Sequence, residues 1–189
     1  MSDFAPTWTA RILTAPPLIA PARQYVYPLY VPGEEDAMSR GALLLDVKPA
    51  AGANFLATCA LGFRDPSLPT GIFACPRPDD LLAVAGGYAY LIDTLAPDRC
   101  LHLPLRPTTQ ILPAPADDLI LLAGFHSVIA VDANGLRWHS ARLSWEGVTM
   151  TEVRDNSLHG TGWNLHTDRE VPFTIDLATG AHEGGGFTA

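Results

Sequence analysis

The sequence predicts an all-β protein built from repeated units of four short strands. Its 17 prolines and 16 glycines are spread over 189 residues, as expected where many short strands are joined by turns. They also interrupt almost every stretch in which the 3.6-residue period of an amphipathic helix could develop. A turn rich in aspartate and a later glycine recur at a fixed spacing of 38 residues. We therefore expect one domain, residues 1–189, composed of similar β units.

The repeat consists of a polar turn, an apolar run and a glycine. Its turns are Asp79-Asp80-Leu81-Leu82, Asp117-Asp118-Leu119-Ile120 and Asp155-Asn156-Ser157-Leu158. Its glycines are Gly86, Gly124 and Gly162. A period near 38 residues with about four strands per unit is close to the ~40–45 residues of a propeller blade. The predicted fold is a partial or open β-propeller-like arc of about three four-stranded blade units, at 71–107, 108–145 and 146–189, plus an N-terminal β segment.

Residues 1–70 carry strand-like runs at 24–31, 42–47 and 54–63 but lack the repeated turn and glycine. We expect them to form either an irregular β segment or a degenerate blade that caps the arc. Between two of these runs, Glu34, Glu35 and Asp36 predict an exposed acidic loop and a candidate binding feature.

The repeated units are interpreted strand by strand. Runs at 72–75, 110–112 and 148–153 predict first strands, and the nearly continuous apolar runs 81–85 and 119–123 predict second strands buried on both faces. The third copy, 158–163, alternates in polarity and predicts a half-exposed terminal strand. Third strands are expected at 128–132 and 172–176, followed by turns in which Gly135 and Gly180 supply a positive φ. The alternating run 136–143 predicts a half-buried fourth strand.

One of these units resembles a known blade pattern. The run from Val128 to Trp138 includes Asp132-Ala133-Asn134-Gly135-Leu136-Arg137-Trp138, which is similar to the hydrophobic-Asp-x-x-Gly-x-x-Trp signature of quinoprotein-type propeller blades. The match is partial from Ile175-Asp176 to Gly180 and His182, and poor near Ile92-Asp93, where Pro97 replaces the turn glycine. The resemblance implies architecture and the packing of Trp138 between blades, and it implies no cofactor.

Composition and charge limit the partners. The formal net charge of −8 and the lack of a Lys/Arg cluster disfavour nucleic-acid binding and favour a basic protein partner. No apolar run approaches the ~20 residues that span a bilayer, and the start of the chain lacks a secretory pattern, so we expect a cytoplasmic protein with no membrane role. Three cysteines outside any metal-ligand spacing predict reduced thiols. Exposed sheet edges make a homodimer possible.

Catalytic and metal motifs are lacking. The sequence has no HExxH, no Gly-x-Ser-x-Gly elbow and no Walker-type loop, so we predict no metal and no cofactor and assign no catalytic residue. The first functional hypothesis is a non-enzymatic interaction module, in its sharper version an immunity or inhibitor protein for a basic toxin. The alternative is a hydrolase or lyase with Asp, Glu and His residues on loops.

Because Trp, Arg and His gather at interface hot spots, the candidate binding residues are Trp145, Glu146, His139, Arg142 and His159. Trp145 is expected to be exposed, whereas Trp163, like Trp138, is expected to lie in the core or to pack between blades.

Overall fold

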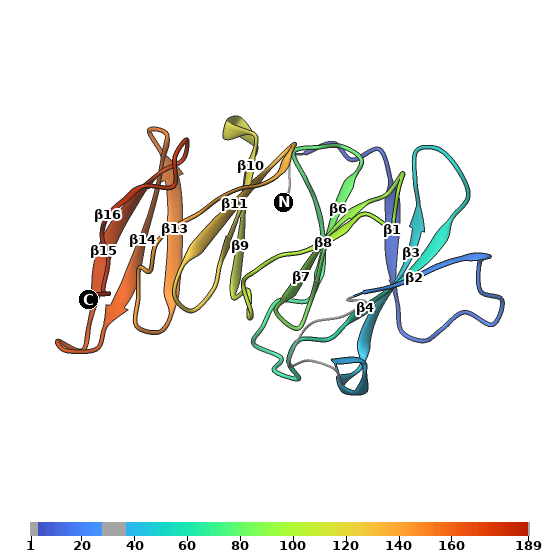
Figure 1. The fold of residues 1–189 in the computed structure, drawn as a ribbon, viewed down its shortest axis with the longest axis horizontal. Helices are drawn as coiled ribbons and strands as arrows, with labels where there is room; N and C mark the ends of the chain where they lie inside the picture. The colour runs from blue at the N-terminus through green and yellow to red at the C-terminus, as the bar shows by residue number, and fades with distance from the viewer. Residues whose placement is uncertain (1–3, 28–36, 189) are drawn as a thin grey trace. The chain divides into compact units, whose positions relative to one another are not determined.

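The computed structural model describes residues 4–27 and 37–188, and every sheet in it has four strands (Figure 1). The chain divides into two compact units, Met1–Pro107 and Thr108–Ala189, and each contains two sheets. Three sheets are antiparallel meanders of consecutive strands, as in propeller blades, and none of the described sheets closes into a barrel. The predicted all-β, blade-like class is therefore confirmed at the level of the sheets.

In the first unit, the N-terminal sheet has an order that the sequence did not predict. Its strands are β1 (Thr9–Leu13), β2 (Arg23–Tyr27), β3 (Ala42–Lys48) and β4 (Phe55–Ala60), with a short 3-10 helix η1 (Ala37–Arg40) before β3. The strand order is β1-β3-β4-β2, and β2 pairs with β4 in parallel. The described residues before Gly71 thus form a fourth four-stranded sheet, but not by the simple meander of the repeated units.

The second sheet of this unit is a meander of β5 (Gly71–Ala74), β6 (Asp80–Ala85), β7 (Tyr88–Asp93) and β8 (Cys100–His102). Every residue of β6 and β7 is buried, which agrees with the continuous apolar run in the sequence. One apolar cluster joins the two sheets, with Leu45 and Phe55 from the first packed with Leu81 and Tyr90 from the second. Burial on both faces fixes these central strands.

The second unit contains the other two meanders. One is formed by β9 (Gln110–Ala114), β10 (Leu119–Ala123), β11 (Val128–Asp132) and β12 (Gly135–His139), with a 3-10 helix η2 (Pro115–Asp117) before β10. The other is formed by β13 (Val148–Arg154), β14 (Ser157–Asn164), β15 (Arg169–Asp176) and β16 (His182–Gly184). The predicted fourth strand ends early, at His139, and beyond it Ser140 still bonds Val128 through its backbone N–H and its hydroxyl oxygen.

Trp138 joins the two sheets of the second unit. Its side chain lies in their shared apolar cluster, and its indole Nε1 donates to the carbonyl oxygen of Leu177 at 2.8 Å. This confirms the predicted packing role. A second bridge comes from Gln110 on β9, whose amide donates to Met150 O and accepts from Met150 N, both at 2.8 Å. The two sheets are therefore held by directional bonds as well as apolar contact.

The polar turns use the conformations that their residues predicted. Asp118, Asp155 and Asn156 have φ of 53°, 51° and 58°, a left-handed region that Asp and Asn tolerate better than most residues. Gly135 has φ of 104° in the β11–β12 hairpin. The repeated glycines do not occupy equivalent positions in their sheets. Gly86 has φ of 53° in a tight turn, whereas Gly162 lies within β14. The β14–β15 hairpin therefore extends beyond its counterpart in the preceding sheet.

The last sheet has one apolar face and one polar face. Along β14, buried Leu158, Gly160, Gly162 and Asn164 alternate with half-buried Ser157, His159, Thr161 and Trp163. Leu158 belongs to the apolar cluster of the unit, so the other row lies on the opposite face of the sheet. The predicted half-exposed terminal strand is confirmed.

Candidate interaction site

The turns at one end of the second unit gather a cation, two aromatic rings and two imidazoles. The Arg142 cluster comprises His126, Arg142, Trp145, His166 and Phe187. The guanidinium carbon of Arg142 lies 5.1 Å from the centre of the Trp145 ring and 4.5 Å from that of Phe187. The Trp145 and Phe187 rings are 5.0 Å apart, and the His166 ring meets Trp145 edge-on at 5.6 Å. Distances of this order allow cation–π attraction.

Backbone carbonyl groups hold the Arg142 guanidinium in place. Arg142 Nε donates to Ser144 O and Nη2 donates to Trp145 O, both at 2.9 Å. Nη2 also lies 3.4 Å from His126 Nδ1. Within the described residues, no carboxylate oxygen lies within 4.0 Å of Arg142, and Nη1 makes no hydrogen bond. The group is oriented, more than one third exposed and not neutralised by an acid.

Phe187 reaches the cluster because the glycine-rich tail packs against the sheet. Gly186 N donates to Leu143 O at 2.7 Å, and the buried Asn164 Nδ2 donates to Gly186 O at 2.8 Å. A Cβ atom on Gly186 would clash with Gly162 O, and one on Gly162 would clash with Leu143 O. Glycine permits this close backbone approach, so the tail is docked against the sheet and does not fray at this position.

Trp145 is less exposed than the sequence suggested. Its side chain is only partly accessible, and its Nε1 atom is buried without a hydrogen-bond partner among the described residues. The other three indole nitrogens have acceptors: Trp8 bonds Asp80 O, Trp138 bonds Leu177 O and Trp163 bonds Asp168 Oδ1. Trp163 lies on the polar face of β14, so it does not fill the predicted position between blades.

The two imidazoles of the cluster are oriented differently. Because a guanidinium can only donate, His126 Nδ1 accepts from Arg142, and the proton of a neutral His126 ring is on Nε2. His166 contacts Trp145 through its ring. Both side chains are exposed, so their outer nitrogen atoms are accessible to a ligand.

A third histidine lies close by in a different arrangement. His139 Nε2 is 2.7 Å from Ser127 Oγ, and Ser127 follows His126 in the chain. Burial lowers the pKa of His139, which favours its neutral form. Ser127 is buried, with 9% of its surface exposed, whereas its partner His139 is exposed.

The structure brings together some of the predicted binding residues. Arg142 and Trp145 are in direct contact, and His139 lies at the same end of the unit through Ser127. Glu146 is exposed next to Trp145 but makes no hydrogen bond or ion pair with any described residue. His159 belongs to the other part of β14, where its Nδ1 lies 3.3 Å from Thr174 Oγ1. Glu34, Glu35 and Asp36 fall outside the described residues.

Sequence reasoning missed three members of the cluster: His126, His166 and Phe187. None belongs to a motif, and each reaches Arg142 or Trp145 from a different turn or from the tail. The only available signal was Gly184-Gly185-Gly186, which precedes an aromatic residue and can follow a neighbouring backbone closely.

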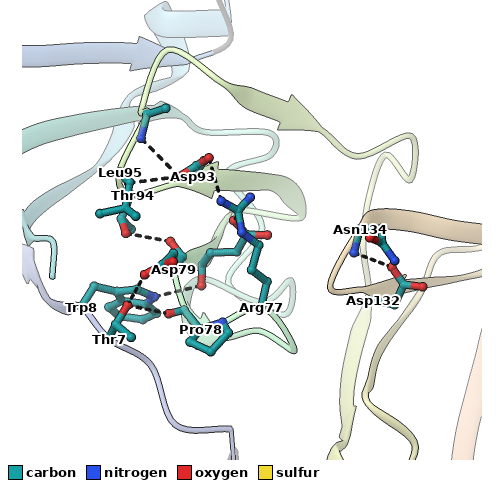
Figure 2. A network of polar contacts seen from close by, with 12 residues as sticks. Thr7, Trp8, Arg77, Pro78, Asp79, Asp93, Thr94, Leu95, Asp132 and Asn134 are labelled. Carbon is teal, nitrogen blue, oxygen red and sulfur yellow. Dashed lines mark hydrogen bonds and ion pairs between the residues drawn. The ribbon is translucent and has the colours of Figure 1, made fainter. Parts of the chain in front are cut away.

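A polar network in the first unit is structural. Figure 2 shows Thr7 and Trp8 against the turn before β6, with Arg77 directed toward Asp93. Thr7 Oγ1 donates to Pro78 O at 3.2 Å, and Arg77 forms ion pairs with Asp80 at 3.4 Å and with Asp93 at 3.2 Å. Desolvation is the main cause that raises the pKa of Asp80 to about 6. This network joins the N-terminal segment to the second sheet.

No group of three or more metal-ligating side chains occurs among the described residues. No helix in the described ranges has the length and apolar character to cross a membrane. No protein-family model matches this chain, and no curated protein resembles its sequence.

Proposed function

We propose that this protein is a non-enzymatic binding module that holds a protein partner at the Arg142 cluster. The observation that carries the proposal is the guanidinium of Arg142, which is stacked on Trp145 and Phe187, fixed by two backbone carbonyl groups and left without a carboxylate partner among the described residues. A guanidinium that is already oriented and has no acid partner among the described residues can pair with an anionic group of a ligand.

Two physical arguments support an interface at this position. Trp and Arg are the residue types most enriched among interface hot spots, where truncation costs ~2 kcal/mol or more. Binding also requires less loss of side-chain entropy when the contact residues are already ordered. Here, the hydrogen bonds of Arg142 and the docked tail supply that order before a partner arrives.

The sharper version of the proposal is an inhibitor or immunity protein for a basic toxin. The net charge of −8 attracts a basic partner over long range and increases the rate of encounter. The described cysteines are all unpaired, which supports a reducing compartment such as the cytoplasm. A gene for a basic toxin next to the gene for this protein, and rescue of growth on co-expression, would support this version.

The experiment is affinity purification from native cells with size-exclusion chromatography, light scattering and mass spectrometry of the eluted complex. We expect a stoichiometric partner with the wild-type chain, at least a ten-fold loss with Arg142→Ala and no loss with Arg169→Ala. Arg169 is the matched control because it is an exposed arginine on β15 without an ion pair to any described residue. Elution of the wild type alone, or equal recovery of the partner by both variants, would contradict the proposal.

A second candidate function is acyl hydrolysis at the Ser127–His139 pair, which the 2.7 Å distance favours. Ser127 Oγ would attack an ester carbonyl carbon while His139 Nε2 takes the hydroxyl proton, and the departing alcohol would then receive that proton. Water would hydrolyse the acyl-serine and regenerate the hydroxyl group. Labelling by a fluorophosphonate probe, lost in Ser127→Ala, would support this function. A lack of labelling in the wild type would remove it.

A further inference from the structure

We infer that the Arg142 cluster accepts a carboxylate group that lies beside an apolar group on the surface of the partner. This inference rests on the proposed binding function and specifies the chemistry of the contact. It does not require the partner to be acidic as a whole, because the contact uses a single carboxylate.

The first argument concerns charge. Of the three other arginines of the second unit, Arg137 Nη1 is 3.8 Å from Asp132 and Arg154 Nη1 is 3.1 Å from Glu152. Arg169 makes no ion pair with a described residue, but within the described ranges no aromatic ring or backbone carbonyl group lies against its guanidinium as such groups lie against that of Arg142. The positive charge of Arg142 has no such compensation among the described residues. The carbonyl groups of Ser144 and Trp145 orient the guanidinium but carry no net charge. An external anion would supply the missing compensation.

The second argument concerns geometry. Nε and Nη2 of Arg142 are used by backbone carbonyl groups, which fixes the plane of the guanidinium and leaves Nη1 available. A charge-assisted hydrogen bond from Nη1 to a carboxylate oxygen has an ideal length of ~2.7–2.9 Å and is about twice as strong as a neutral one. His126 adds no second donor toward Arg142, because its Nδ1 faces the guanidinium and accepts from it, so its protonated Nε2 points away.

The third argument concerns the apolar part of the ligand. Trp145 and Phe187 are both partly exposed beside the guanidinium, so a ligand that meets Arg142 also contacts aromatic surface. Covering these rings excludes water and strengthens the charge interaction. An acidic side chain or chain terminus next to an aromatic or aliphatic residue fits both requirements.

The negative charges of the chain disfavour a polyanionic ligand. Glu146 lies next to Trp145 in the chain and is exposed, and the whole chain carries a net charge of −8. Repulsion increases with each negative charge on the ligand, so it weakens the binding of a nucleic acid more than the binding of a single carboxylate. The inferred ligand is therefore one carboxylate on a protein surface that is otherwise neutral or basic.

The test is a titration of the isotope-labelled full chain, followed by nuclear magnetic resonance of the indole and guanidinium N–H groups. The probe is N-acetylphenylalanine, which combines a carboxylate with an aromatic ring, and its control is the neutral N-acetylphenylalaninamide. We expect saturable shifts at Trp145 Nε1–H and Arg142 Nε–H with the acid, and at least ten-fold weaker binding with the amide. Arg142→Gln should weaken binding of the acid at least ten-fold, and Arg169→Gln should leave it unchanged.

Equal binding of the acid and the amide would overturn the inference, because the rings would then recognise the ligand without the charge. Absence of saturable shifts with the acid, or saturation by inorganic phosphate alone, would overturn it as well. The spectra also report whether Arg142→Gln is folded, and the comparison of the two probes on the wild type does not depend on that variant. If the carboxylate probe fails while partner recovery still requires Arg142, the binding function stands and this inference falls.

Discussion

Replacing the buried Asp80 carboxylate by an amide should stabilise the protein at neutral pH. The Asp80 side chain is only 7% exposed, and its charge partner, Arg77, lies at 3.4 Å with 39% of its side chain exposed. Desolvation outweighs that attraction and raises the pKa of Asp80 to about 6, with smaller contributions from the carboxylates of Asp93 and Asp79. An ionised Asp80 therefore lowers the stability of the fold, whereas the uncharged amide of the Asp80→Asn variant would not.

The magnitude follows from the two pKa values. A pKa of about 6 in the fold against the ordinary 3.8 corresponds to about 3 kcal/mol. That pKa already includes the attraction of Arg77, so loss of the pair is not subtracted again. We therefore expect Asp80→Asn to raise the free energy of unfolding by about 3 kcal/mol at pH 7.5.

The pH dependence gives the sign of the effect. Because the folded protein binds the Asp80 proton more tightly than the unfolded chain does, stability from this group is greatest below pH ~4 and is lost as the pH rises through ~6. The advantage of Asp80→Asn should therefore shrink toward zero as the pH falls from 7.5 to 4.

Urea unfolding of both proteins at pH 4, 5, 6 and 7.5 measures this difference. Asp98→Asn, at an exposed position, is the control and should change stability by less than ~0.5 kcal/mol throughout. A loss of stability in Asp80→Asn at pH 7.5, or a difference between the proteins that does not depend on pH, would refute the reasoning.

Three further predictions concern packing, and urea unfolding at pH 7.5 tests each. Trp138→Phe should cost about 1–3 kcal/mol, because the bonded Leu177 carbonyl loses its indole donor and part of the apolar contact; an unchanged midpoint would contradict that role. Gly162→Ala should cost at least ~1–3 kcal/mol because the new Cβ would clash with Leu143 O, and full stability would mean that the backbone at Leu143 can shift freely. Leu121→Ala should cost about 2–5 kcal/mol, since truncation of this fully buried side chain leaves a cavity at β10, and a loss below ~1 kcal/mol would show that the core collapses around it.

The repeated units were predictable because their signals are local. The continuous apolar run before Gly124 predicted a strand buried on both faces, and Asn134-Gly135 predicted the β11–β12 hairpin. Both depend on residues within about ten positions of each other, where side-chain period and turn chemistry act directly.

The N-terminal sheet was less predictable because its pairing is not local. Strand β1 spans only Thr9–Leu13 and pairs with β3, which is not the next strand in the chain, so no hairpin turn in the sequence indicates this pairing. The parallel pairing of β2 with β4 likewise depends on a connection whose path a single sequence does not specify. Runs of strand-forming residues identified three of these strands, but not their order.

The sequence predicted only part of the candidate site, because some of its contacts join residues that are far apart in the chain. Residue type alone pointed to Arg142 and Trp145, but Phe187 joins them from the far end of the chain through backbone contacts of the tail. The environments expected for Trp145 and Trp163 differ from those observed, because Phe187 of the docked tail packs against Trp145, and Trp163 lies on the polar face of β14. No periodicity in the sequence encodes the docking of the tail.

The polar face of the last sheet also affects how separate molecules meet. His159 and Thr161 on β14 lie opposite Thr174 and Thr149 on its neighbours, so hydroxyl and imidazole groups occupy the face away from the core of the unit. Face-to-face stacking of a second molecule would bury these groups without enough partners, at a cost of about 1–3 kcal/mol for each unsatisfied group. A chain made of self-similar units is at risk of growing end to end into fibres, and this face makes such growth unfavourable.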